Sequence, residues 1–94
     1  MNIRISDLAQ VDILDIWDFL EAQNVSKADR FIDVLTAQFE QFISFPEMGR
    51  RRDEFGKSYR SFVMRDYVVF YRILGETIEI SRVVHGSRNL EGLL

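Results

Sequence analysis

The fold of this chain is decided by residues 67–85, which read YVVFYRILGETIEISRVVH. Two runs rich in Val, Ile and aromatic residues flank Gly75 and Glu76, and such runs fit the pleated surface of β-strands. Glycine at the first central position of a two-residue turn is typical of type II′, which requires a positive φ there. The sequence therefore predicts a long β-hairpin. Its register pairs Leu74 with Thr77, Arg72 with Glu79 and Tyr71 with Ile80.

Two helical patterns and two extended segments precede the hairpin. Residues 3–5 alternate as a short strand, and Ser6 is a suitable N-cap for the helix that follows. The second helical pattern ends near Ser44, because Pro46 disfavours the α conformation in the residue before it. Residues 58–64 form a further extended segment.

Short signals mark the boundaries of these elements. Asn24 is expected to close the first helix in a left-handed conformation. Ser26, with Asp29 three residues later, resembles a capping box that starts the second helix. A turn at Arg65 and Asp66 leads into the hairpin.

The order of these elements, β-α-α-β-β-β, has no β-α-β alternation, which favours an α+β fold with an antiparallel sheet. Two helices of roughly 15 to 18 residues are expected to form a hairpin on one face of that sheet. Residues 67–74 are apolar on both faces, so we expect this strand at the centre of the sheet with some cover on each side. At 94 residues, the chain is expected to be one domain spanning residues 1–94.

The composition excludes several kinds of site. The chain has no cysteine, which excludes disulfides and thiolate metal sites and fits a cytoplasmic location. Its one histidine excludes metal sites built on histidine clusters, and we expect no metal or cofactor. The sequence has no apolar run of the roughly 18 residues that a transmembrane helix needs. Its first residues lack the apolar core of a signal peptide.

The net charge of −3 is unevenly distributed. Residues 1–49 carry three basic and nine acidic side chains, whereas residues 50–94 carry nine basic and six acidic ones. Phosphate contacts supply most of the affinity of nucleic-acid-binding proteins, which usually have a strong basic excess. Direct binding to nucleic acid is therefore not expected.

Apolar residues of the first helix occupy more than one face. The stripe expected to face the core consists of Ala9, Ile13, Ile16, Trp17 and Leu20. Three further apolar residues, Val11, Leu14 and Phe19, lie at its flanks or beyond. The favoured interpretation is that the second helix and the sheet bury them, and the alternative is a surface for a partner. The carboxylates of this helix are expected to form a solvated face.

Three adjacent arginines, Arg50, Arg51 and Arg52, form the most basic run in the chain. The favoured interpretation is a solvated loop in which they pair with Asp53 and Glu54, and exposed pairs of this kind add little stability. The alternative is a docking patch for an acidic partner or for phosphate.

His85, at the end of the hairpin, is a candidate for acid–base chemistry. It lies close in sequence to Arg82 and Arg88, and hairpin geometry brings it near Tyr67. A histidine flanked by arginines could exchange a proton with a phosphodiester while the arginines stabilise negative charge. The favoured interpretation is structural, with the ring packed at the sheet edge and bonded to the terminal loop, because no second titratable partner is evident.

Four stretches of the sequence resemble signatures of one family. They are DILDIWDFL at 12–20, FPEMGR at 45–50, YVVFYRI at 67–73 and IEISRVVHGSR at 78–88. Taken in order and at this spacing, they resemble the ParE branch of the RelE/ParE toxin superfamily, whose members are also called plasmid stabilisation proteins. The resemblance covers nearly the whole chain and implies a helical hairpin on an antiparallel sheet.

The resemblance also implies a function. Members of the family are toxins of type II toxin–antitoxin systems, and a ParD-like antitoxin usually has a ribbon-helix-helix domain and a disordered tail that folds on the toxin. ParE-like toxins act on DNA gyrase, so we expect a gyrase inhibitor rather than an enzyme. RelE-like relatives instead cut messenger RNA on the ribosome. A third alternative is an inactive toxin that acts only as a corepressor with its antitoxin.

These expectations select two sets of residues. For an endoribonuclease, the candidate catalytic residues are Arg65, Arg82, His85 and Arg88. Gly86 stands where some ribonuclease relatives have a tyrosine, and the negative net charge disfavours docking on RNA. For partner binding, the candidates are Val11, Leu14, Phe19, Arg50, Arg51, Arg52, Leu90, Leu93 and Leu94.

Overall fold

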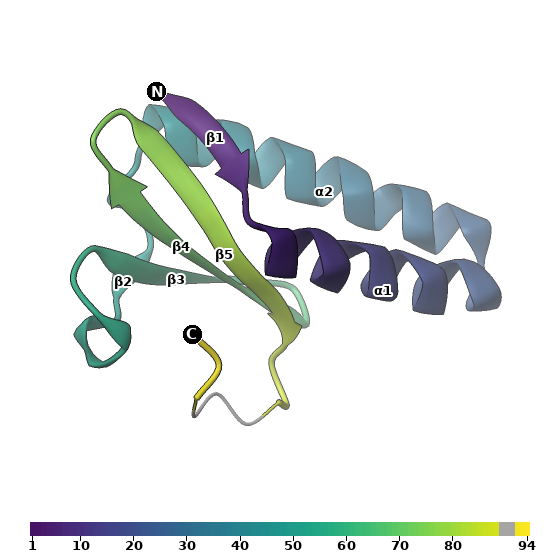
Figure 1. The fold of residues 1–94 in the computed structure, drawn as a ribbon. Helices are drawn as coiled ribbons and strands as arrows, with labels where there is room; N and C mark the ends of the chain where they lie inside the picture. Colours follow the sequence, from purple (N-terminus) through teal and green to yellow (C-terminus); the bar gives the residue numbers. More distant parts are fainter. Residues whose placement is uncertain (89–91) are drawn as a thin grey trace.

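The computed structural model describes residues 1–88 and 92–94. Two helices lie against a five-stranded sheet of order β1-β5-β4-β3-β2 (Figure 1), which confirms the predicted α+β fold. In chain order the elements are β1 (Asn2–Ile5), α1 (Asp7–Gln23), α2 (Val25–Ser44), β2 (Arg50–Arg51), the 3-10 turn η1 (Asp53–Phe55), β3 (Tyr59–Met64), β4 (Tyr67–Leu74) and β5 (Thr77–His85).

The first strand departs from the prediction of a fully antiparallel sheet. β1 pairs with β5 in parallel, with Ile5 opposite Ile80, whereas the other strand pairs are antiparallel. The two helices carry the chain from this edge of the sheet to the opposite edge, so the last strand returns to lie beside the first in the same direction (Figure 1). The short strand β2 is a second difference from the prediction, because it lies within a segment that the sequence predicts to be a loop.

The long hairpin has the predicted register. All three predicted residue pairs are present, and Nε of Arg72 donates to Oε1 of Glu79 at 2.9 Å. Gly75 has a φ of +58°, and Glu76 is not among the residues with positive φ. This combination fits the predicted type II′ turn.

A β-bulge in β5, which the sequence pattern does not predict, changes the alternation of the strand. The pairing passes from Tyr71 opposite Ile80 to Phe70 opposite Arg82, so β5 has one extra residue. As a result Ile80 and Val83, three residues apart, both lie in the core beneath the helices.

One asparagine caps both helices. Asn24 has extended backbone angles, and its N–H donates to the carbonyl of Leu20, which ends α1. Its side chain accepts from the backbone N–H groups of Ser26 and Lys27, which starts α2. The predictions of a left-handed Asn24 and of a capping box at Ser26 are therefore wrong. A junction of one residue has no room for separate caps.

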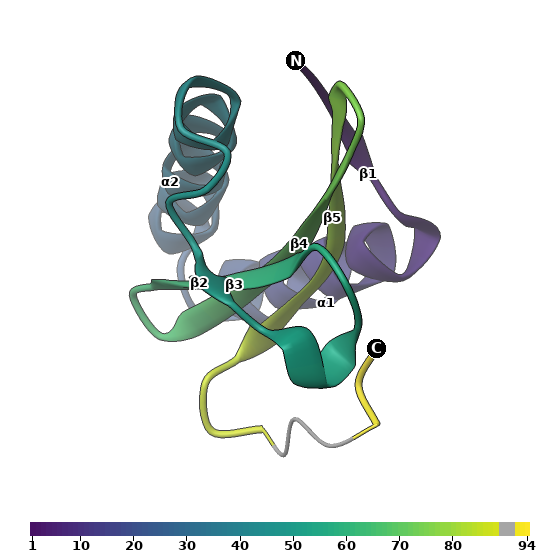
Figure 2. The same cartoon turned by 90° about the vertical axis from the view of Figure 1, so that its left-hand side faces the viewer.

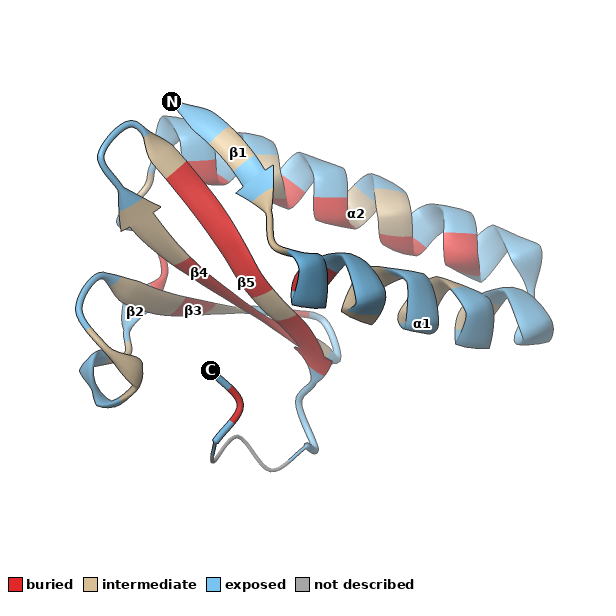
Figure 3. Ribbon diagram, in the orientation of Figure 1, coloured by how far each residue is buried: buried red, intermediate tan, exposed pale blue. Residues whose placement is uncertain are grey.

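The main core lies between the helices and the sheet (Figure 3). Phe42 of α2 stacks on Tyr71 of β4, with ring centroids 4.2 Å apart. The Tyr71 hydroxyl donates to the carbonyl of Pro46 and accepts from the N–H of Gly49, both at 2.8 Å. The loop after α2 is thereby fixed to the centre of the sheet.

A smaller apolar cluster covers the other face of the sheet. Its buried residues are Val68, Phe70, Val84 and Leu93, and Phe55 of η1 packs against them. Figure 2 shows η1 and the C-terminal end on the side of the sheet away from α2. The prediction that the middle strand is covered on both faces is confirmed.

Candidate functional site

His85 is exposed at the end of β5 and is held by its own turn. Its Nδ1 lies 2.7 Å from Oγ of Ser87, whose backbone N–H also donates to this nitrogen at 3.2 Å. The ring packs edge-on against Tyr67, with centroids 5.7 Å apart at 83°. Burial, with a smaller contribution from Asp66, raises the pKa of the Tyr67 phenol, so this hydroxyl stays protonated at neutral pH.

Arg82 is committed to a buried ion pair rather than presented to a substrate. Its Nε and Nη2 donate to the two carboxylate oxygens of Asp12 at 2.8 and 2.9 Å, and Nη1 donates to the carbonyl of Leu93. The two charged side chains are 11% and 10% exposed. The hydrogen bonds that Arg82 donates to Asp12 raise the pKa of Arg82. Because Asp12 also accepts from the N–H of Val83, this carboxylate joins α1 to β5.

Each of the other two candidate arginines lines a hollow that His85 also lines. Arg65, exposed in the turn between β3 and β4, lines a cleft of about 420 Å³ together with His85. Arg88 lines a second hollow of about 310 Å³ with His85, and that hollow also contains Asp12 and Asp15. Arg65 and Arg88 thus each share a hollow with the histidine, whereas the guanidinium group of Arg82 is bound by Asp12.

The sheet face away from the helices carries arginines that are already paired. Ile78 and Ile80 lie in the core, so Glu79 between them faces the opposite side. Glu79 is 8% exposed and accepts hydrogen bonds from both Arg4 and Arg72. One carboxylate therefore offsets part of the positive charge of these two arginines.

The three adjacent arginines have different environments. Arg51 pairs with Asp53 at 3.0 Å, and Arg52 pairs with Glu54 at 3.0 Å, as the solvated-loop interpretation predicts. Arg52 is nevertheless only 14% exposed, because its guanidinium lies over the rings of Phe55 and Phe70. As part of the packing of η1, Arg52 is not available as a docking residue, which leaves Arg50 and Arg51 on the surface.

The outer face of α1 is both apolar and acidic, and we call it the apolar-acidic face. Four large apolar side chains are between 55% and 64% exposed: Leu8, Val11, Leu14 and Phe19. The exposed carboxylates among them are Asp7, Asp15, Asp18 and Glu21. The expectation that the second helix and the sheet bury Val11, Leu14 and Phe19 is wrong, because α1 packs inward through one stripe only (Figure 3).

The C-terminal candidates divide in a similar way. Leu93 is 8% exposed and belongs to the smaller apolar cluster on the sheet face away from the helices, whereas Leu94 is 39% exposed. Leu90 lies outside the described residues. Leu93 therefore contributes to packing. Of the C-terminal candidates that the structure describes, Leu94 is the one that remains on the surface.

A family model described as "ParE toxin of type II toxin-antitoxin system, parDE" matches residues 3–90. The chain belongs to the ParE toxin family. It is therefore a type II toxin–antitoxin toxin by family.

Two relatives in sequence are named as toxins, one ParE and one RelE. Toxin ParE3 of Caulobacter vibrioides is 30% identical over 77 residues, which cover 82% of this chain and 77% of the relative. Toxin RelE3 of the same organism is 28% identical over 85 residues, covering 89% and 92%. A solved structure titled "Chromosomal ParDE TA system from P. aeruginosa" has the same fold, with a TM-score of 0.75 at 18% identity and coverage of 90% and 95%.

The sequence pattern does not predict the roles of two residues of this ParE family member, Asp12 and Leu8. Asp12 belongs to the carboxylates expected to be solvated, yet it lies three residues after the buried Ala9 and four before Ile16. That position at the flank of the core stripe is the signal that could have found it. Leu8 lies in the first turn of α1, where the helical periodicity of apolar residues is too short to show whether its side chain is exposed or buried.

Two further kinds of site were sought in the described part of the chain. Residues 1–88 and 92–94 contain no group of three or more His, Asp or Glu side chains placed to hold a metal ion. No helix among these residues is long and apolar enough to cross a membrane.

Proposed function

We propose that this ParE family member inhibits DNA gyrase by binding it, without cutting nucleic acid, and that a ParD-like antitoxin neutralises it. The single observation that supports this proposal is the ion pair that Arg82 forms with Asp12. A nuclease of this superfamily would need free cations beside His85 to stabilise negative charge on a phosphodiester. Here Asp12 binds Arg82 through both carboxylate oxygens.

The experiment that tests gyrase inhibition is supercoiling of relaxed plasmid by purified gyrase, with the toxin added and no ribosomes present. Inhibition, or trapped cleaved DNA, at stoichiometric toxin is the expected result. Full supercoiling in excess toxin would refute the proposal.

We further propose that the antitoxin tail docks on the apolar-acidic face of α1. Tails that fold on binding bury apolar surface, and this face offers Val11, Leu14 and Phe19 in an acidic field. Basic residues in the tail would speed association at low salt. Replacing Asp7, Asp15 and Asp18 by Asn should slow association at low ionic strength. An unchanged association rate would contradict this placement.

One observation favours a second candidate function, a ribosome-dependent endoribonuclease. Arg65 and Arg88 each line a hollow together with His85, and one relative is named Toxin RelE3. If His85 is the acid or base, His85→Ala should lower messenger RNA cleavage by about 10²–10⁴-fold. Cleavage assays with ribosomes separate this function from gyrase inhibition.

A further inference from the structure

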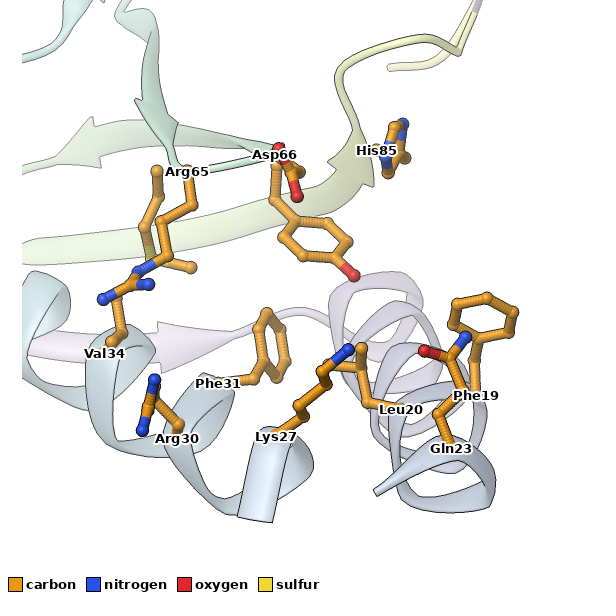
Figure 4. Close-up of a pocket in the computed structure, with 12 residues that line it drawn as sticks. Phe19, Leu20, Gln23, Lys27, Arg30, Phe31, Val34, Arg65, Asp66 and His85 are labelled. Carbon is orange, nitrogen blue, oxygen red and sulfur yellow. The ribbon is translucent and has the colours of Figure 1, made fainter. Parts of the chain in front are cut away.

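A cleft at one end of the molecule is lined by both helices, by strands β3, β4 and β5 and by the turn between β3 and β4 (Figure 4). The end of α1 contributes Phe19, the start of α2 contributes Lys27, Arg30 and Phe31, and the turn between β3 and β4 contributes Arg65. We call it the cationic cleft. Figure 4 shows Lys27 and Arg30 reaching in from α2 and Arg65 from the turn across from them.

No described carboxylate neutralises the three cations of the cleft, in contrast to the five arginines that form ion pairs, which are Arg4, Arg51, Arg52, Arg72 and Arg82. Lys27, Arg30 and Arg65 are exposed, and none forms an ion pair or a side-chain hydrogen bond with another described residue. Asp66 is the one acidic residue that lines the cleft. An unpaired group of this composition attracts an anion.

The walls of the cleft are aromatic. Phe31 and Tyr67 pack together with ring centroids 5.2 Å apart, and Phe19, which is 64% exposed, lies at the rim. Apolar walls with a few placed charges are the usual chemistry of a binding pocket. The fitting ligand therefore combines carboxylates or phosphates with an apolar body.

The surroundings favour a peptide over a nucleic acid. The neighbouring hollow shares Phe19, Tyr67 and His85 with the cleft. It is also lined by Arg88, by Asp12, which is paired with Arg82, and by the exposed Asp15 of α1. A strand of nucleic acid that left the cleft on this side would bring its next phosphates towards the exposed carboxylates of α1, beginning with Asp15. A peptide can place acidic residues in the cleft and continue with neutral or basic ones.

We propose that the cationic cleft binds an acidic segment of a partner protein, with an aromatic or aliphatic residue between its carboxylates. The guanidinium groups of Arg30 and Arg65 and the ammonium group of Lys27 would bind the carboxylates, and the apolar residue would pack on Phe31 and Tyr67. This site is opposite in charge to the apolar-acidic face of α1, and Phe19 lies at the border of the two. It requires neither gyrase nor the antitoxin, so its failure would leave the proposed function untouched.

The probe is the peptide acetyl-Glu-Leu-Phe-Glu-amide, titrated into the labelled protein and followed by NMR shifts of backbone amides. Its matched control is acetyl-Gln-Leu-Phe-Gln-amide. Lys27→Gln, Arg30→Gln and Arg65→Gln should each weaken binding of the acidic peptide by about tenfold, since each removes a charge-assisted hydrogen bond. The control variant is Lys57→Gln, which removes an exposed cation outside the cleft.

The proposal is supported if the acidic peptide shifts amides of the cleft, the neutral peptide does not, and only the Lys57 variant retains full affinity. It is overturned if neither peptide binds, if both bind equally, or if the shifts lie elsewhere. It is also overturned if a short oligothymidylate binds the cleft more tightly than the acidic peptide.

Discussion

At the scale of single residues, a few buried polar groups hold distant parts of the chain together. Asp12 accepts from Arg82 and from the N–H of Val83, so one carboxylate fixes α1 against β5. The hydroxyl of Tyr71 fixes the loop after α2 through Gly49. Each partner lies far along the sequence, and no local pattern predicts such a pair.

Asp12→Asn should destabilise the fold by about 3–5 kcal/mol, because the guanidinium of Arg82 is then buried without a countercharge. The free energy of unfolding in urea measures the change. Asp15→Asn, at an exposed position on the same helix, is the matched control and should stay within about 0.5 kcal/mol of the wild type. Equal effects of the two variants would show that the ion pair is not structural.

Alkaline pH should weaken the fold through Tyr71. Burial raises the pKa of its phenol, whereas an unfolded tyrosine ionises near about pH 10. Above that pH the unfolded state loses a proton that the folded state keeps, so the free energy of unfolding falls as pH rises. Tyr71→Phe should flatten this fall.

Tyr71→Phe should also cost about 1–3 kcal/mol at neutral pH, because the N–H of Gly49 loses its acceptor. Urea unfolding at neutral pH and above about pH 10 measures both effects. Tyr59→Phe is the control, since the Tyr59 hydroxyl bonds to no other described residue. Identical alkaline slopes in wild type and Tyr71→Phe would contradict this assignment.

At the scale of elements, periodicity predicts where helices and strands lie but not how they meet. The hairpin register follows from Gly75 and its flanking runs, because a tight turn fixes pairing locally. The parallel pairing of β1, the bulge in β5 and the shared cap at Asn24 depend on contacts with other elements. For the same reason the pattern does not settle which faces of α1 are exposed.

Asn24→Ala should lower the free energy of unfolding by about 1 kcal/mol, because α2 loses its side-chain cap. Ser26→Ala is the informative control, since the sequence predicts a cap at Ser26 and the structure places it inside the helix. It should change stability by less than about 0.5 kcal/mol. Urea unfolding measures both changes. A larger loss of stability in Ser26→Ala than in Asn24→Ala would instead support a capping box at Ser26.

At the scale of the whole molecule, charge separates into surfaces with different uses. The apolar-acidic face lies on α1, and paired arginines lie on the sheet face away from the helices. Three cations without an ion pair to a described residue line the cationic cleft. The sequence predicts the acidic half and the basic half, and its motifs indicate the family. It predicts the local ion pairs of Arg51, Arg52 and Arg72. It does not predict that of Arg82, because Asp12 and Arg82 are brought together only by the fold.

The most direct test of the proposed function compares wild type and His85→Ala in supercoiling of relaxed plasmid by purified gyrase. If the toxin acts by binding, both proteins should inhibit at the same stoichiometric level, because His85 is exposed and Ser87 and Tyr67 are its described contacts. Circular dichroism confirms that the variant is folded. Failure of the wild type to inhibit, or loss of inhibition by a folded His85→Ala protein, would contradict the account.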